Sequence, residues 1–229
     1  MKKLLIAAVV AGAFVPAAHA ADLIIPQVVD PVVYSAAGFD WSGFYLGVNA
    51  GYGSGNATSV GVLTGATDTV NYNGALLGLT AGVNAQFDAF VLGVEGDVAW
   101  SGVKGTTTCI SGAACTGELN WLGTVRARAG VAYDSILIFA TGGVAFGGIN
   151  ASVSPAQAGT TGSYSTTAWG WTVGAGIEAA VTENMSIKAE YAYTDLGKSQ
   201  APVGTLGLGQ AYDLSPIAHT VKLGVNFHF

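Results

Sequence analysis

Eight charged side chains stand out because they occupy the polar positions of segments that alternate apolar and polar residues. The acidic members are Glu95, Asp97, Glu178 and Glu190, and the basic members are Arg126, Arg128, Lys188 and Lys222. Four acids against four bases make the set neutral. An unpaired charge in a poorly hydrated interior costs several kcal/mol, so the set predicts a network of ion pairs that fills an interior. A selective path for ions is the alternative.

Two cysteines, Cys109 and Cys115, lie six positions apart in a segment rich in glycine and threonine. In an exported chain this pair predicts a local disulfide, with two free thiols as the alternative. The spacing of cysteine and histidine fits no zinc site, and the glycines form no phosphate-binding motif. We therefore expect neither a metal nor a cofactor.

The histidines are the remaining candidates for catalysis or for holding a haem iron. His219 and His228 are separated by an odd number of positions, so they point to opposite faces of a strand and cannot jointly clamp one iron. Ser215 is a candidate nucleophile, with His219 as its base and Asp213 nearby. Clusters of Ser, Asp and Pro, however, more often form turns. We expect no enzyme.

Composition limits what can position these groups. Only 10% of the 229 residues are charged, 51% are hydrophobic and 34 are glycine. A soluble domain has about 25% charged residues and about 7% glycine, so these values argue against a standard cytoplasmic domain. Eight basic residues against fourteen acidic ones also disfavour nucleic acid as a partner.

The N-terminus carries the features of a secretory leader. Lys2 and Lys3 precede an apolar run at 4–15, and Ala18-His19-Ala20 fits a cleavage site. Residues 1–20 are therefore predicted to be a signal peptide, and residues 21–40, with Pro26 and Pro31, a periplasmic linker. No later run reaches 18 apolar residues, so we expect no transmembrane helix.

Residues 41–229 contain eight segments of period-two alternation, the pattern of β-strands. The segments are 41–53, 75–87, 90–101, 119–133, 136–146, 169–181, 185–193 and 219–229. Their length suits strands that cross a bilayer, and an even number allows an antiparallel meander to close. The sequence predicts an all-β, eight-stranded, up-and-down transmembrane β-barrel. Connections at 86–89, 134–135 and 182–184 predict short periplasmic turns, and those at 54–73, 102–117, 147–168 and 196–218 predict long extracellular loops.

The apolar face of the barrel is predicted to point outward. The interior of an eight-stranded barrel is only just wide enough for side chains, and the polar face is mostly glycine and small polar residues. Aromatic residues also gather at the segment ends, where they would form interfacial girdles. The eight charges then lie in the lumen. Since eight strands leave no open aqueous channel, a plug is favoured over an ion path.

Four stretches resemble one family. Residues 41–53 (WSGFYLGVNAGYG), 170–178 (GWTVGAGIE), 188–197 (KAEYAYTDLG) and 221–229 (VKLGVNFHF) are similar to the RopB-type small outer-membrane immunogenic proteins of alphaproteobacteria. The resemblance implies an OmpA-like barrel with structural and surface-antigen roles, no catalytic residues and, in some relatives, haemin binding. Phe227 and Phe229 resemble the C-terminal signal that the barrel-assembly machinery reads.

These expectations combine into one functional hypothesis. The chain is a structural barrel and surface antigen of the cell outer membrane that contributes to membrane integrity. Its expected partners are outer-membrane lipid, lipopolysaccharide and the assembly machinery, with no nucleic acid. The alternatives are a surface module that binds a host, phage or haemin ligand through its loops, and a pore for small solutes.

Overall fold

The computed structural model describes residues 38–109, 112–154, 162–204 and 210–229. The predicted signal peptide at 1–20 and all but the last three residues of the predicted linker at 21–40 lie outside the described residues. Among the described residues, no helix has the length and hydropathy needed to cross a membrane.

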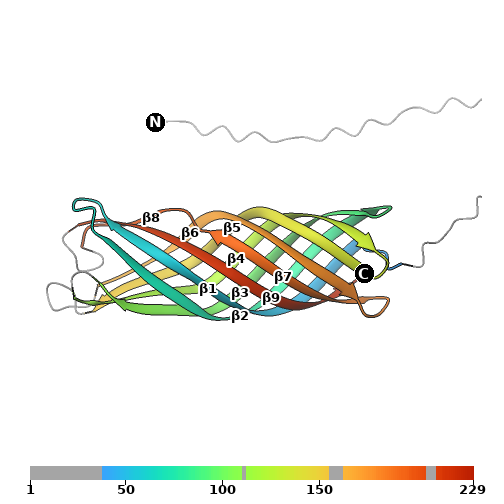
Figure 1. The fold of residues 1–229 in the computed structure, drawn as a ribbon, viewed down its shortest axis with the longest axis horizontal. Helices are drawn as coiled ribbons and strands as arrows, with labels where there is room; N and C mark the ends of the chain where they lie inside the picture. Colours follow the sequence, from blue (N-terminus) through green and yellow to red (C-terminus); the bar gives the residue numbers. More distant parts are fainter. Residues whose placement is uncertain (1–37, 110–111, 155–161, 205–209) are drawn as a thin grey trace, which may run out of the picture. The chain divides into compact units, whose positions relative to one another are not determined.

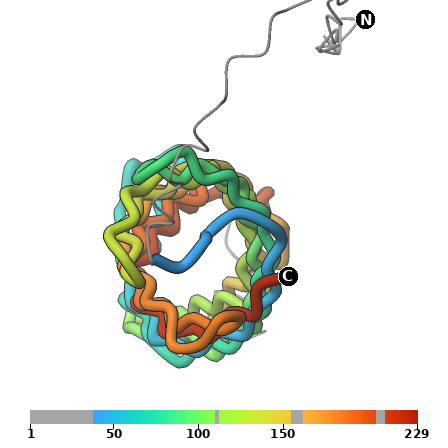
Figure 2. The backbone as a smooth tube through the Cα atoms, turned by 90° about the vertical axis from the view of Figure 1, so that its right-hand side faces the viewer, coloured from blue at the N-terminus to red at the C-terminus, as the bar shows by residue number. Residues whose placement is uncertain are grey.

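The described residues form a single antiparallel sheet of nine strands that closes on itself (Figures 1 and 2). The strands are β1 (Gly43–Gly61), β2 (Thr67–Phe87), β3 (Phe90–Thr108), β4 (Ala114–Tyr133), β5 (Ile136–Ser154), β6 (Gly162–Ala180), β7 (Met185–Asp195), β8 (Ser199–Ala201) and β9 (Tyr212–His228). Each strand from β1 to β6 pairs with the next, β7 pairs with β9, and β9 pairs with β1. Eight strands therefore complete the ring, and the predicted barrel is confirmed.

The ninth strand, β8, is a three-residue segment that pairs with β9 beyond the end of β7. It resumes the path of β7 along β9 after a break at Leu196–Lys198, so it adds no member to the ring.

Tight turns lie at one end of the barrel, which we call the turn end. Asp88 and Asp134 connect β2 to β3 and β4 to β5, with φ values of 53° and 54°. Aspartate tolerates this left-handed conformation better than most residues, so two-residue turns can form there. The opposite end, which includes residues 62–66 and the cysteines Cys109 and Cys115, we call the tip end.

The predicted long loops are largely wrong, because the strands continue through them. Ser54 still pairs with Asn73, and Val60 with Thr67, so β1 and β2 run to the tip end. The other three predicted loops are likewise shortened by β3, β4, β5, β6, β8 and β9. Serine, threonine and asparagine in these segments resemble loop composition, but backbone pairing persists because alternate side chains are buried inside the ring, as at Tyr72 and Ile149.

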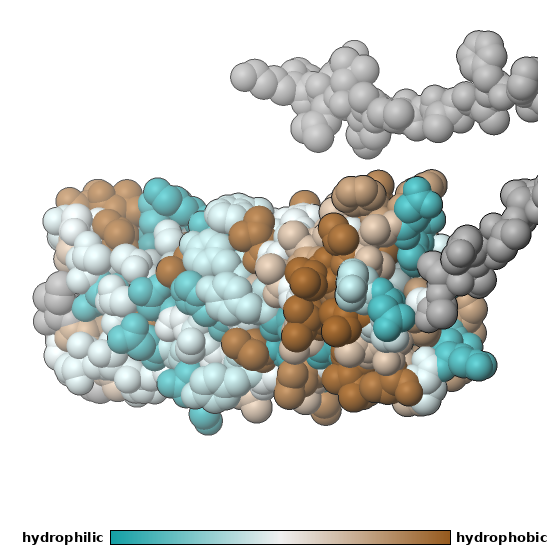
Figure 3. Space-filling model, turned by 45° about the vertical axis from the view of Figure 1, so that its right-hand side comes forward, coloured by the Kyte–Doolittle hydropathy of each residue, from teal (hydrophilic) through white to brown (hydrophobic). Residues whose placement is uncertain are grey.

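The outside of the barrel changes polarity along its axis. Near the turn end its outward side chains are apolar: Leu79, Val94, Val125 and Ile177 are 49%, 52%, 48% and 56% exposed. Toward the tip end the outward positions of β2 are polar, as at Thr69 and Asn71, while Val70 and Tyr72 point inward and are buried. Figure 3 shows most of the apolar surface over one part of the barrel and mainly pale or teal residues over the other. We call the apolar outer surface near the turn end, which includes Leu79, Val94, Val125 and Ile177, the apolar belt. It is the lipid-facing surface of a membrane barrel.

A β-bulge in β4 shifts the inward face by one residue. The register with β5 slips between Leu119 and Trp121, so Leu119 and Leu122 are both buried inside, at 4% and 2% exposure. Uninterrupted period-two alternation through the predicted segment 119–133 would put Leu119 on the same face as Val125. The bulge overturns that assignment, because an extra residue in one strand exchanges the two faces beyond it.

Candidate functional site: the charged layer inside the barrel

The eight predicted charges all point into the barrel and are buried. They come from five strands: Glu95 and Asp97 from β3, Arg126 and Arg128 from β4, Glu178 from β6, Lys188 and Glu190 from β7, and Lys222 from β9. Their exposure runs from 0% for Glu95 to 8% for Lys222. Residues two apart on a strand share a face, which explains why each pair on one strand enters the lumen together. We call this set the charged layer.

Arg126 links carboxylates on two sides of the lumen. Its Nη2 lies 2.5 Å from Oε1 of Glu95, its register partner on the neighbouring strand. Its Nη1 donates to Oε1 of Glu190, which belongs to β7. Strands β5 and β6 separate β4 from β7 around the ring, so this second ion pair crosses the interior.

Glu95 collects further donors at its other oxygen. The Nζ of Lys188 lies 2.7 Å from Oε2 of Glu95, and the hydroxyl of Tyr45 donates to the same oxygen at 2.8 Å. Lys188 also lies 3.6 Å from Oε2 of Glu190. Two cations therefore stand between two carboxylates, which neutralises the middle of the layer.

A second cluster surrounds Glu178. Arg128 donates to its Oε2, while Ser186 Oγ and Asn226 Nδ2 donate to its Oε1 at 2.5 and 2.6 Å. The guanidinium carbon of Arg128 also lies 4.0 Å from the centre of the Phe139 ring, a cation–π contact. Both Glu178 oxygens thus have partners although the residue is 0% exposed.

A third pair joins β9 to β3. Nζ of Lys222 lies 2.5 Å from Oδ1 of Asp97, and Nδ2 of Asn49 donates to Oδ2 of Asp97 at 2.9 Å. Asn49 also donates to the hydroxyl of Thr80 at 2.8 Å. With this pair, each of the eight charges has at least one oppositely charged partner.

Apolar side chains enclose the charged layer on both sides. Toward the turn end lies a cluster of Trp41, Val91, Leu137 and Phe139, and toward the tip end one that includes Leu76, Ala99, Leu122, Ala145 and Leu196. A void beside Arg126, Glu190 and Lys222 measures about 10 Å³, and a single water needs at least about 10–15 Å³. This void is therefore about the size of a single water molecule.

The sequence-based set missed several other polar members of the layer. Tyr45, Asn49, Ser186, Asn226 and His228 are all buried inward and hydrogen-bond to the charges or to one another. Their position on the polar face of the alternation was the available signal. The set was selected from the Asp, Glu, Arg and Lys residues alone, so its other hydrogen-bonding side chains were left out.

The two histidines lie on opposite faces of β9. His228 is buried, with Nε2 3.0 Å from Ser186 Oγ, and its ring packs against Trp41. His219 faces outward, with Nδ1 2.7 Å from the Tyr191 hydroxyl. Asp213 accepts a hydrogen bond from Gln200 rather than from His219.

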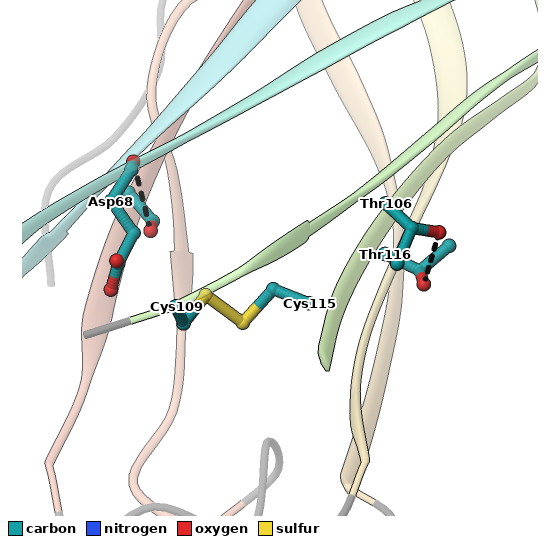
Figure 4. The surroundings of a disulfide bond; sticks show 6 residues. Asp68, Thr106, Cys109, Cys115 and Thr116 are labelled. Atoms are coloured by element: carbon teal, nitrogen blue, oxygen red, sulfur yellow. Dashed lines mark hydrogen bonds between the residues drawn. A yellow bond between two sulfur atoms is a disulfide. The ribbon is translucent and has the colours of Figure 1, made fainter. Parts of the chain in front are cut away.

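The disulfide and the C-terminal phenylalanines are not part of the charged layer. Cys109 and Cys115 are bonded, with Cα atoms 5.9 Å apart, where β3 and β4 meet at the tip end (Figure 4). Thr106 and Thr116 add a side-chain hydrogen bond of 2.9 Å between the same strands. Phe227 and Phe229 point outward, at 46% and 70% exposure.

Comparison with known proteins adds to this geometry. The family described as outer membrane protein beta-barrel domain matches residues 5–229. The chain is 35% identical to the 31 kDa outer-membrane immunogenic protein of Brucella melitensis over all of both chains. It is 33% identical to the 22 kDa outer membrane protein of Rhizobium leguminosarum, over 82% of this chain and 78% of that one. The solved structure of OprG from Pseudomonas aeruginosa resembles it in fold, with a TM-score of 0.54, 16% identity, and coverage of 84% of this chain and 99% of that one.

Proposed function

The chain belongs to the outer membrane β-barrel family that includes these immunogenic proteins, and from this premise we propose that it is a structural barrel whose lumen is closed by the charged layer. It resides in the outer membrane, with the apolar belt in lipid and the tip end displayed at the cell surface. The proposal involves no catalytic step. Its partners are the membrane lipid and lipopolysaccharide and, during biogenesis, the assembly machinery.

The observation that supports a plug is a pair of ion pairs that cross the lumen between two buried apolar clusters. Arg126 pairs with Glu190, and Lys188 pairs with Glu95. A solvated pore would need these charges to face water. Instead Glu95 is fully buried and Arg126 is 3% exposed. Breaking one partner of such a buried pair costs about 3–5 kcal/mol, so the layer resists opening.

Single-channel recording in planar bilayers tests the plug directly. We expect the wild-type protein to show no stable, porin-like conductance. The double variant Arg126→Ala, Lys188→Ala removes two central side chains and is expected to give short, irregular current steps. Lys104→Ala, on the exposed outward face of β3, is the matched control and should stay silent. Large, reproducible steps from the wild-type protein would refute the plug.

A deletion strain tests the structural role in the cell. We expect increased sensitivity to detergents, restored by the wild-type gene. A strain with an intact barrier but a specific defect in adhesion or uptake would instead favour the surface-binding alternative.

A further inference from the structure

The tip half of the barrel contains a cavity of about 300 Å³ that the charged layer does not use. Its wall includes Tyr72, Leu119, Ile149, Tyr164 and Leu214, which come from five different strands. We call this space the tip chamber. Ligand pockets span about 300–1,000 Å³ and are lined mainly by apolar and aromatic side chains, so the chamber has the size and the lining of a small pocket.

The wall of the chamber is built in the manner of a water-soluble ligand-binding barrel. On β2 the outward residues Thr69 and Asn71 are polar, whereas the inward residues Val70 and Tyr72 line the cavity. This is the reverse of the arrangement in the apolar belt. An eight-stranded barrel with an apolar interior is wide enough to hold one small ligand.

The floor of the chamber is closed. Leu76, Leu122 and Leu196 belong to the apolar cluster between the chamber and the charged layer, and all three are buried. The chamber is therefore a blind pocket that a ligand enters and leaves from the tip end, not a stage in passage across the membrane.

The charges around the chamber select against anions. Asp68, which shares the inward face of β2 with Val70, is among its lining residues, whereas no lysine, arginine or histidine is found among the lining residues that the structure describes. Several wall groups already bond within the protein: the Tyr72 hydroxyl donates to the Ile217 carbonyl at 2.6 Å, and Gln210 donates to the Tyr212 hydroxyl at 3.1 Å. Among the described lining residues a ligand therefore meets no cation, and the Tyr72 hydroxyl is already committed as a donor within the protein.

We propose that the tip chamber binds one small, uncharged, mainly apolar molecule from the external medium. This assigns a binding site in addition to the structural role, and it does not depend on whether the charged layer conducts. Carboxylated lipids are disfavoured because like-charge juxtaposition costs several kcal/mol.

A matched pair of probes tests both the site and its charge preference. The folded protein in lipid nanodiscs is titrated with 1-naphthol or with 1-naphthalenesulfonate, which share a ring system and differ in charge. Binding is followed by the amide chemical shifts of the protein. We expect saturable shifts with naphthol at Ile149 and Leu214 but not at Leu79 on the lipid face, and affinity for the sulfonate at least about tenfold weaker.

Filling the chamber should remove binding without affecting the fold. Ala151→Phe and Ala57→Phe each place a ring in the cavity from a different strand, while Ser165→Phe places one on the exposed outer surface. Folding of each variant is checked by heat-modifiable gel migration. We expect each filled variant that folds to lose naphthol binding and the Ser165 variant to keep it. Shifts that fail to saturate, equal affinity for the two probes, or unchanged binding by both filled variants would overturn the proposal.

Discussion

The ion pairs of Arg126 offer the sharpest test of the charged layer. The substitution Arg126→Met keeps an unbranched apolar stem but removes the guanidinium that joins Glu95 to Glu190. Glu95 keeps Lys188 at 2.7 Å and Tyr45 at 2.8 Å, whereas Glu190 keeps only Lys188, at 3.6 Å, as a charged partner among the described residues. We expect the free energy of unfolding to fall by about 3–5 kcal/mol, the cost of leaving a buried charge without its partner.

Urea unfolding in detergent micelles, followed by tryptophan fluorescence and by gel migration, measures this change. Glu190→Gln should restore part of the loss, with a coupling of about 0.5–3 kcal/mol in the double-mutant cycle, because it removes the orphaned carboxylate. Lys104→Met is the control at an exposed outward position and should lie within about 0.5 kcal/mol of wild type. If Arg126→Met costs no more than this control, the charged layer does not stabilise the barrel.

Three further predictions concern the belt, the tip end and assembly. Val125→Arg should cost about 2–4 kcal/mol if it lies near the bilayer midplane, whereas Thr69→Arg, on the polar outer surface, should cost about 1 kcal/mol or less; equal costs in urea unfolding would contradict the polarity boundary. Replacing Cys109 and Cys115 with serine should lower stability by about 2 kcal/mol, since the loop they close is short, and reduction of the wild-type protein should match it in the same assay. Phe229→Ala should reduce the folded fraction in outer-membrane preparations while the purified variant still refolds in detergent; undiminished assembly would remove the proposed signal role.

The alternation of residue types was enough to predict most of the membrane barrel. Period-two patterns in residues 41–229 placed the strands, and their even number predicted closure. The choice of the outward face followed from the size of the apolar residues, and the structure confirms it at Leu79 and Ile177. The same parity placed Glu95 with Asp97, and Arg126 with Arg128, on the inner surface, because side chains two apart on a strand share a face.

Other features depended on the closed ring and could not be read from one strand at a time. Parity says which face a charge occupies, but the pairing of Arg126 with Glu190 depends on how the ring brings β4 opposite β7. The bulge near Leu119 changes parity without a signal in the local pattern. The sequence pattern did not predict that strands continue through residues 54–73, because serine, threonine and asparagine are common both in loops and on the solvent-exposed outer face of a strand. Which of the two they form is decided by whether their alternate neighbours, such as Val70 and Tyr72, find an interior to bury them, and only the assembled barrel provides that interior.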